Sequence, residues 1–266
     1  MAIDYVDLGT FWHKLDPRTK LIWTLAVIVT LVVWTDPLWG LIPLILIVIP
    51  GVIARTPWGK VWAFLKWLLP FMFLTMFLMS VTYSPTLLKY PEANKTIFEI
   101  GPLRGTLGGF LYSISFTEKM IFAIILISVL TFSTPFTDIL YTLQKYGVPY
   151  QLTFIVATAW RLVPMFQNLF NEIVSAQRAR AWESESGSSF HRIRKMVPAL
   201  APLYNQAINQ IERMALAMES RAFGASKKVT VLKEFKWTIG DYIVVAVCVV
   251  IIVLAVATAV MGYGML

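Results

Sequence analysis

Five long apolar runs are the feature of this sequence that most restricts its fold. They cover Thr19–Thr35, Leu38–Ala54, Val61–Tyr83, Leu107–Phe132 and Ile239–Gly262. A transmembrane helix needs about 20 consecutive, mainly apolar residues. Inside a bilayer, only helices and closed barrels satisfy every backbone polar group. The runs therefore predict an all-α, polytopic membrane protein with about five transmembrane helices.

The composition supports this class. Hydrophobic residues make up 58% of the chain and charged residues 14%, whereas a soluble domain is about half apolar and about a quarter charged. The fourth run is interrupted by Glu118 and Lys119, and ionisable residues inside a membrane often mark an ion site. Adjacent residues on a helix do not face each other, so each needs its own partner, which favours a structural or subunit-contact role.

Lysine and arginine lie mainly on one side of the predicted spans. Thirteen of them fall between Phe132 and Ile239, and others flank the ends of the first three runs. The loop Ser84–Thr106, on the opposite side, contains only Lys89, Lys95 and Arg104. Basic residues are enriched in cytoplasmic loops. The N-terminus and the long polar region are therefore predicted to be cytoplasmic, and five spans place the C-terminus outside.

The spans divide the chain into three parts. Residues 1–132 hold the first four predicted spans, residues 133–236 a cytoplasmic module of amphipathic helices, and residues 237–266 the last span. Within the module, "STPFTDILYTL" predicts a short helix and Thr153 to Arg180 a longer one. Pro198 and Pro202 either bend the helix that follows or mark its beginning.

The last helix of the module has a clear apolar face, because its apolar residues are spaced by three or four. These residues are Leu200, Leu203, Ala207, Ile211, Met214 and Met218. Three interpretations remain open: the faces pack within the module, lie at the lipid interface, or dock onto a partner protein.

Two short patches near the ends of these helices share one pattern. Ala179 and Ala181 flank Arg180, and Ser220 and Ala222 flank Arg221. Small neighbours leave the guanidinium free to approach a facing surface closely, and its planar fork suits carboxylates and carbonyls. A solvated helix surface could carry the same tripeptides, so the pattern alone does not assign a function.

The sequence carries no recognisable catalytic, metal or nucleotide motif. His13, His191 and Cys248 have no metal-ligand spacing, and no phosphate-binding loop is found. We therefore expect no enzyme activity, catalytic residue, metal or cofactor in this chain. The basic residues flank membrane spans, so nucleic acid is not an expected partner.

Several segments together resemble a known family. In chain order they are "LDPRTKL", "STPFTDILYTLQKYGVP", "RLVPMF", "AQRARA" and "AMESRAFG". They resemble the transmembrane component of energy-coupling factor (ECF) transporters, the EcfT family, over essentially the whole chain. In that family the two arginine motifs usually read Ala-Arg-Gly. Here Ala181 and Ala222 replace glycine and Ser220 replaces alanine, which preserves small neighbours.

The resemblance implies a role in a prokaryotic plasma membrane. Arg180 and Arg221 would dock into two ABC-type ATPase subunits, which bind the ATP, and the apolar face would contact a small substrate-binding membrane subunit. The chain would thereby couple ATP hydrolysis to uptake of a vitamin or a metal ion. A self-contained secondary transporter, or another permease subunit, is the alternative, although the sequence lacks the two related halves typical of the former.

Overall fold

The computed structural model describes residues 8–82, 96–100, 103–180, 189–225 and 237–262. The chain divides into two compact units, one formed by Met1–Thr142 with Phe235–Leu266 and the other by Leu143–Glu234. We call them the first and second units and describe each by itself. The predicted three-part division at residues 133 and 236 concerns membrane insertion and stays a prediction.

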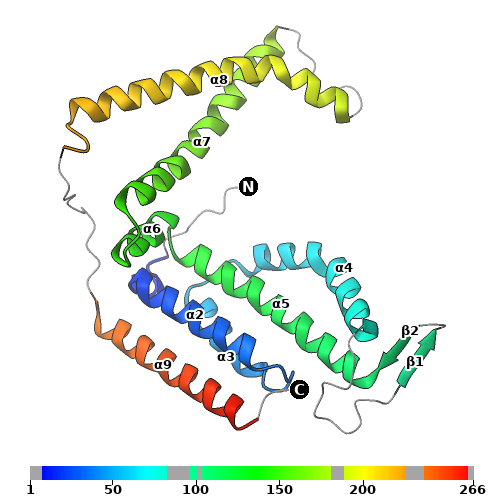
Figure 1. Cartoon of the computed structure of the whole chain (residues 1–266). Coiled ribbons are helices and arrows are strands. Elements are labelled where there is room, and N and C mark those ends of the chain that lie inside the picture. Colours follow the sequence, from blue (N-terminus) through cyan, green and yellow to red (C-terminus); the bar gives the residue numbers. More distant parts are fainter. Residues whose placement is uncertain (1–7, 83–95, 101–102, 181–188, 226–236, 263–266) are drawn as a thin grey trace. The chain divides into compact units, whose positions relative to one another are not determined.

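The first unit is helical apart from one hairpin, so the all-α polytopic class is confirmed. Its helices are α1 (Phe11–Lys14), α2 (Pro17–Val33), α3 (Leu41–Ile53), α4 (Trp58–Thr82), α5 (Leu107–Ser133) and α9 (Ile239–Val260) (Figure 1). Helix α6 (Phe136–Lys145) follows α5 along the chain. The strands β1 (Thr96–Ile100) and β2 (Leu103–Thr106) pair antiparallel between α4 and α5. Sequence reasoning did not predict this hairpin.

Three helices of the described residues are long and apolar enough to cross a membrane. They are Trp58–Ser80 within α4, Leu107–Ser133 and Ile239–Val260. The first two predicted runs form shorter helices, since α2 has 17 residues and α3 has 13. A turn separates them, in which Trp39 and Gly40 donate backbone hydrogen bonds to the carbonyl of Asp36. The residues of this turn belong to neither helix, so both helices are shorter than the predicted runs.

Helix α2 begins where the sequence predicts. Asp16 is the N-cap, its side chain accepts a hydrogen bond from the backbone N–H of Arg18, and Pro17 occupies the first turn. An N-cap carboxylate satisfies a donor that the helix itself leaves unpaired, and proline fits the first position because its missing N–H is not needed there.

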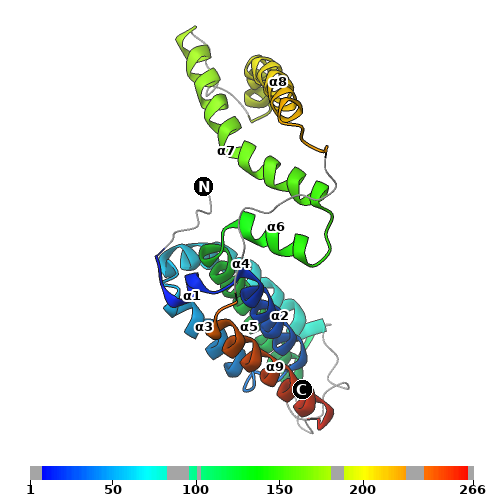
Figure 2. The ribbon, with the colours of Figure 1, turned by 90° about the vertical axis from the view of Figure 1, so that its left-hand side faces the viewer.

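Helix α2 also supplies much of the apolar core of the first unit. Trp23, Ala26 and Val27 are buried together with residues of α3, α5 and α9, including Ile47, Leu126 and Cys248. Figure 2 shows α2, α5 and α9 running alongside one another. Lipid tails are as apolar as leucine, so close packing rather than escape from water holds such helices together.

Helices α4 and α5 approach closely at one glycine. A Cβ atom added to Gly109 would lie 2.5 Å from the backbone carbonyl oxygen of Ser80. Small residues commonly allow such close contacts between membrane helices. Gly109 therefore permits the contact between the N-terminal end of α5 and α4.

The charged pair inside α5 is half-buried. A Cβ atom on Gly40 would lie 2.5 Å from Oε1 of Glu118, so this carboxylate lies against the residue that precedes α3. Negative charge is favoured near a helix N-terminus. The contact supports a structural role for Glu118.

Candidate functional site

The second unit is built around two long helices. Helix α7 covers Tyr150–Ala179 and helix α8 covers Ser189–Ser220. A turn through Gly147, whose φ is +104°, separates α6 from α7. Pro198 and Pro202 both lie inside α8, so the interpretation that either one begins the helix is wrong.

Helices α7 and α8 run antiparallel, as two contact regions demonstrate. The rings of Tyr150 and Phe154, at the start of α7, lie 6.2 and 4.7 Å from the ring of Phe223, just after α8. Farther along, Ile173 of α7 and Gln206 of α8 line one groove. The start of α7 thus meets the end of α8, and the later part of α7 meets the middle of α8.

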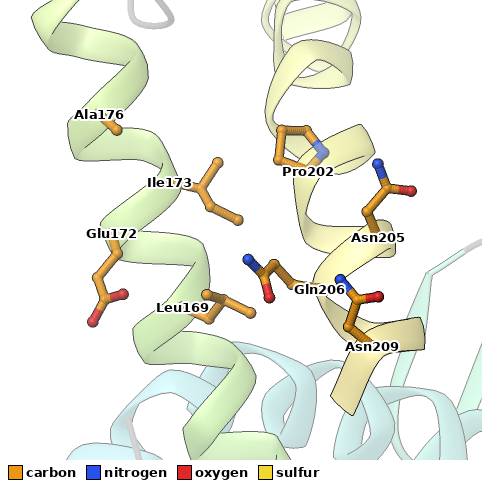
Figure 3. A pocket seen from close by; sticks show the side chains of 8 residues that line it. All are labelled: Leu169, Glu172, Ile173, Ala176, Pro202, Asn205, Gln206 and Asn209. Carbon is orange, nitrogen blue, oxygen red and sulfur yellow. The ribbon is translucent and has the colours of Figure 1, made fainter. Parts of the chain in front are cut away.

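The groove between the two helices is lined by mainly apolar side chains of α7 and mainly amide side chains of α8. Leu169 and Ile173 point from α7 toward α8, and Gln206 points back toward α7 (Figure 3). The remaining lining residues are Glu172, Ala176, Pro202, Asn205 and Asn209. At this level the exposed amide residues of α8 line the groove, while Leu203 and Ala207 of the predicted apolar face are more covered.

The predicted apolar face of α8 is divided in the structure. Leu200 and Ile211 are exposed, at 50% and 57%. Leu203, Ala207, Met214 and Met218 are half-buried. The face is therefore open at two positions and partly covered at four.

A second apolar stripe on α8 was missed by sequence reasoning. Val197, Tyr204 and Ile208 are exposed and continue the three-and-four spacing through Leu200 and Ile211. Helix α7 similarly exposes Leu152, Ile155, Val156, Trp160 and Val163. The signal was present in the spacing, but the sequence does not reveal which of two adjacent apolar stripes is covered.

Arg180 ends the first long helix. It is the C-cap of α7, it is exposed, and its backbone N–H donates to the carbonyl of Gln177 at 3.0 Å. Ala179 is the last residue of the helix, while Ala181 lies outside the described residues. Arg180 thus lies at a helix end, where the sequence predicted it, and its docking role stays a prediction.

Arg221 lies in a defined helix-ending turn. The N–H of Phe223 donates to the carbonyl of Met218 at 3.0 Å, and the N–H of Ala222 to that of Glu219 at 2.9 Å. These two bonds form a Schellman motif. Its left-handed position is Ala222, with φ of +54°. This is a place where glycine is the usual residue, because a Cβ atom is strained there.

The two arginines lie far apart. Arg221 precedes Phe223 by two residues and so lies near the start of α7, whereas Arg180 is at its end. At about 1.5 Å per residue, the helix from Phe154 to Arg180 spans roughly 40 Å. Both guanidinium groups belong to exposed residues, so they can contact two separate surfaces.

Comparison with known proteins gives consistent matches along the chain. A model of the CbiQ family, described as cobalt transport protein, matches residues 9–231. The chain is 28% identical over 247 residues to the energy-coupling factor transporter transmembrane protein EcfT of Staphylococcus aureus, covering 90% of this chain and 89% of the relative. It is 28% identical over 258 residues to the protein of that name from Limosilactobacillus fermentum, covering 94% of each chain. The Bacillus subtilis protein of that name is 29% identical over 265 residues, covering 93% of each chain.

Proposed function

Because the chain belongs to the CbiQ family and is the transmembrane component of an ECF transporter, we propose that it couples two ATPase subunits to a substrate-binding membrane subunit. ATP is bound and hydrolysed by the partners, and this chain holds no cofactor of its own. The transported solute is a vitamin or a metal ion, selected by the substrate-binding subunit.

The observation that carries the proposal is the placement of the two arginines. Each is exposed and ends a different helix of an antiparallel pair, roughly 40 Å from the other by helix rise. One pair of helices can thus hold two ATPase subunits at once, Arg180 against one and Arg221 against the other. Each guanidinium meets carboxylates or carbonyls of its ATPase.

Coupling requires that these contacts differ between partner states. A ligand shifts an equilibrium only by its differential affinity for the two states, so the ATPases must bind the α7–α8 pair differently before and after hydrolysis. The helices then move with the ATPases and carry the displacement to the substrate-binding subunit.

The substrate-binding subunit contacts the apolar side of α8. The exposed Leu200 and Ile211 form the centre of this contact. The more covered residues of the same face also belong to it: Leu203, Ala207, Met214 and Met218. An amphipathic helix commonly binds a partner through side chains with this spacing. Tyr204, which is 67% exposed, extends the same surface.

The second unit and the N-terminus face the cytoplasm, and the C-terminus lies outside the plasma membrane. The basic residues support this orientation. So does one structural contact, since the N-terminal ends of α2 and α9 meet through a hydrogen bond between the Asp16 N–H and Asp241. These two helices therefore start on the same side of the membrane.

The proposal is tested by reversing charge at the arginines. We expect Arg180→Glu or Arg221→Glu each to weaken ATPase association by about 2–5 kcal/mol, as for a buried, hydrogen-bonded charge pair, and the double variant to lose ATP-driven uptake. The measurement is co-purification of the ATPases in mild detergent, followed by uptake in liposomes. Arg161→Glu, an exposed arginine in the middle of α7, is the control and should leave both unchanged.

Two outcomes would contradict the proposal. If the double variant assembles and transports like the parent, the two arginines do not form the ATPase contact. Solute uptake by the purified chain alone, without ATP, would favour a self-contained secondary transporter.

A further inference from the structure

Buried polar side chains gather where three helix ends meet in the first unit. They come from the start of α2, the end of α5, helix α6 and the start of α9. The buried polar residues of these segments are Asp16, Thr19, Lys20, Ser133, Thr134, Asp138, Thr142 and Asp241. Buried polar groups are costly unless they are hydrogen-bonded, so these residues form bonds that specify how the helix ends fit together.

Asp241 joins the first turns of α2 and α9. It is fully buried, and its Oδ1 accepts hydrogen bonds from the Asp16 N–H at 2.9 Å and from the Thr19 hydroxyl at 2.8 Å. Its Oδ2 accepts the backbone N–H of Thr238, the N-cap of α9, at 2.8 Å. One carboxylate thus lies at two helix N-termini, where negative charge is favoured.

Lys20 joins the same turn of α2 to the end of α5. Its side chain is 2% exposed, and Nζ donates to the backbone carbonyl of Ser133 at 2.9 Å. Ser133 is the last residue of α5, and its carbonyl is one that the helix cannot satisfy itself. The positive charge also complements the negative end of the α5 dipole.

These contacts hold two helix ends that lie on either side of the second unit in the sequence. The chain leaves the first unit within α6, after Thr142, and returns at Phe235, shortly before α9. Lys20 binds the last residue of α5, and Thr19 binds Asp241 in the first turn of α9. The first turn of α2 therefore holds two helix ends that flank the second unit in the sequence.

We propose that the first turn of α2 is a mechanical junction within the first unit, which ties the end of α5 and the start of α9 to the core helix α2, with Thr19 and Lys20 as its positioning residues. The inference rests on the function proposed above and extends it from the ATPase contacts to the path of the displacement. When the ATPases move α7 and α8, the displacement reaches α2 through the end of α5 and the start of α9. The core helix α2 then moves with them.

The test measures coupling separately from assembly. The whole complex, with ATPases and substrate-binding subunit, is placed in liposomes, and uptake of radioactive Co²⁺ or radioactive water-soluble vitamins is measured beside ATP hydrolysis. In Lys20→Met, which keeps the apolar stem, and in Thr19→Val, which keeps the shape, we expect uptake per ATP hydrolysed to fall by about fivefold or more. The amount of assembled complex and the ATPase rate should stay near those of the parent.

Two variants serve as matched controls. Thr19→Ser keeps the hydroxyl that reaches Asp241 and should preserve the coupling ratio. Lys66→Met removes an exposed lysine from α4 and should also have no effect. A second measurement is hydrogen exchange, which should become faster in the last turn of α5 in Lys20→Met but not in Lys66→Met.

The outcomes separate this inference from the proposed function. If the parent complex shows no ATP-driven uptake, the proposed function fails. If the parent transports and the Lys20 and Thr19 variants keep its uptake per ATP, the junction is refuted. It is equally refuted if uptake and ATPase activity fall together with the amount of complex, because the residues would then only maintain the fold.

Discussion

Replacing Ala222 with glycine should stabilise the turn that carries Arg221. Ala222 has φ of +54°, and the left-handed conformation costs an L-residue with a Cβ atom roughly 1–2 kcal/mol. Glycine avoids this strain but gains freedom in the open state, which offsets part of the benefit. We therefore expect a net stabilisation of about 1 kcal/mol, or about a fivefold lower opening constant for the turn.

Hydrogen exchange at single amides measures this effect directly. The informative amide is that of Phe223, whose N–H is bonded to the Met218 carbonyl within the turn. Its exchange should slow by about fivefold in Ala222→Gly if exchange follows local opening. A second alanine-to-glycine substitution is the control for effects on the helix itself. Ala217→Gly, at an exposed position inside α8, should instead speed exchange, because glycine in a helix interior costs about 1 kcal/mol.

The contrast between the two alanines makes the reasoning refutable. If Ala222→Gly speeds exchange at Phe223 as Ala217→Gly does, the left-handed strain at Ala222 is absent. Ala222→Val provides the opposite perturbation, since a β-branched side chain is poorly tolerated at positive φ. It should open the turn more readily than the parent.

Two further predictions concern helix surfaces. Ile211→Glu should reduce co-purification of the substrate-binding subunit, because a carboxylate would enter an apolar contact. Asn209→Glu, on the amide side of α8, should have little effect on this co-purification. If both variants co-purify the subunit as well as the parent does, this side of α8 does not contact it. Gly109→Ala should lower thermal stability in detergent by about 1–3 kcal/mol, as overpacking does, because its Cβ would lie 2.5 Å from the Ser80 carbonyl oxygen. Gly59→Ala should not lower the stability, because a Cβ atom at this position meets no atom within 4 Å. An equal loss of stability in Gly59→Ala would show that the clash at Gly109 is not the cause.

The sequence predicted the features that depend on local pattern. Apolar runs located the long membrane helices, and three-and-four spacing located α7 and α8. The cap formed by Asp16 and Pro17 was readable because capping depends on neighbouring residues. Arg180 and Arg221 were found at helix ends for the same reason.

The sequence could not predict contacts between distant residues. Thr19 binds Asp241, 222 positions away, and Lys20 binds the carbonyl of Ser133, 113 positions away. No local period records such pairs, so Lys20 was interpreted only as a basic residue flanking a span. The second, exposed stripe of α8 was missed for a related reason, since burial depends on which neighbouring helix each face meets.

Because α7 and α8 run antiparallel, the length of α7 sets the distance between the two arginines. Each residue of an α-helix adds about 1.5 Å and turns the chain by about 100°. A single insertion between Phe154 and Arg180 would therefore swing Arg180 to another side of the helix while Arg221, held near the start of α7 by Phe223, stayed in place. An insertion of about seven residues would restore the direction of Arg180 but move it outward by about 10 Å. If the arginines dock as proposed, the separation of the two ATPase surfaces fixes the number of residues in α7, whereas its exposed side chains can vary.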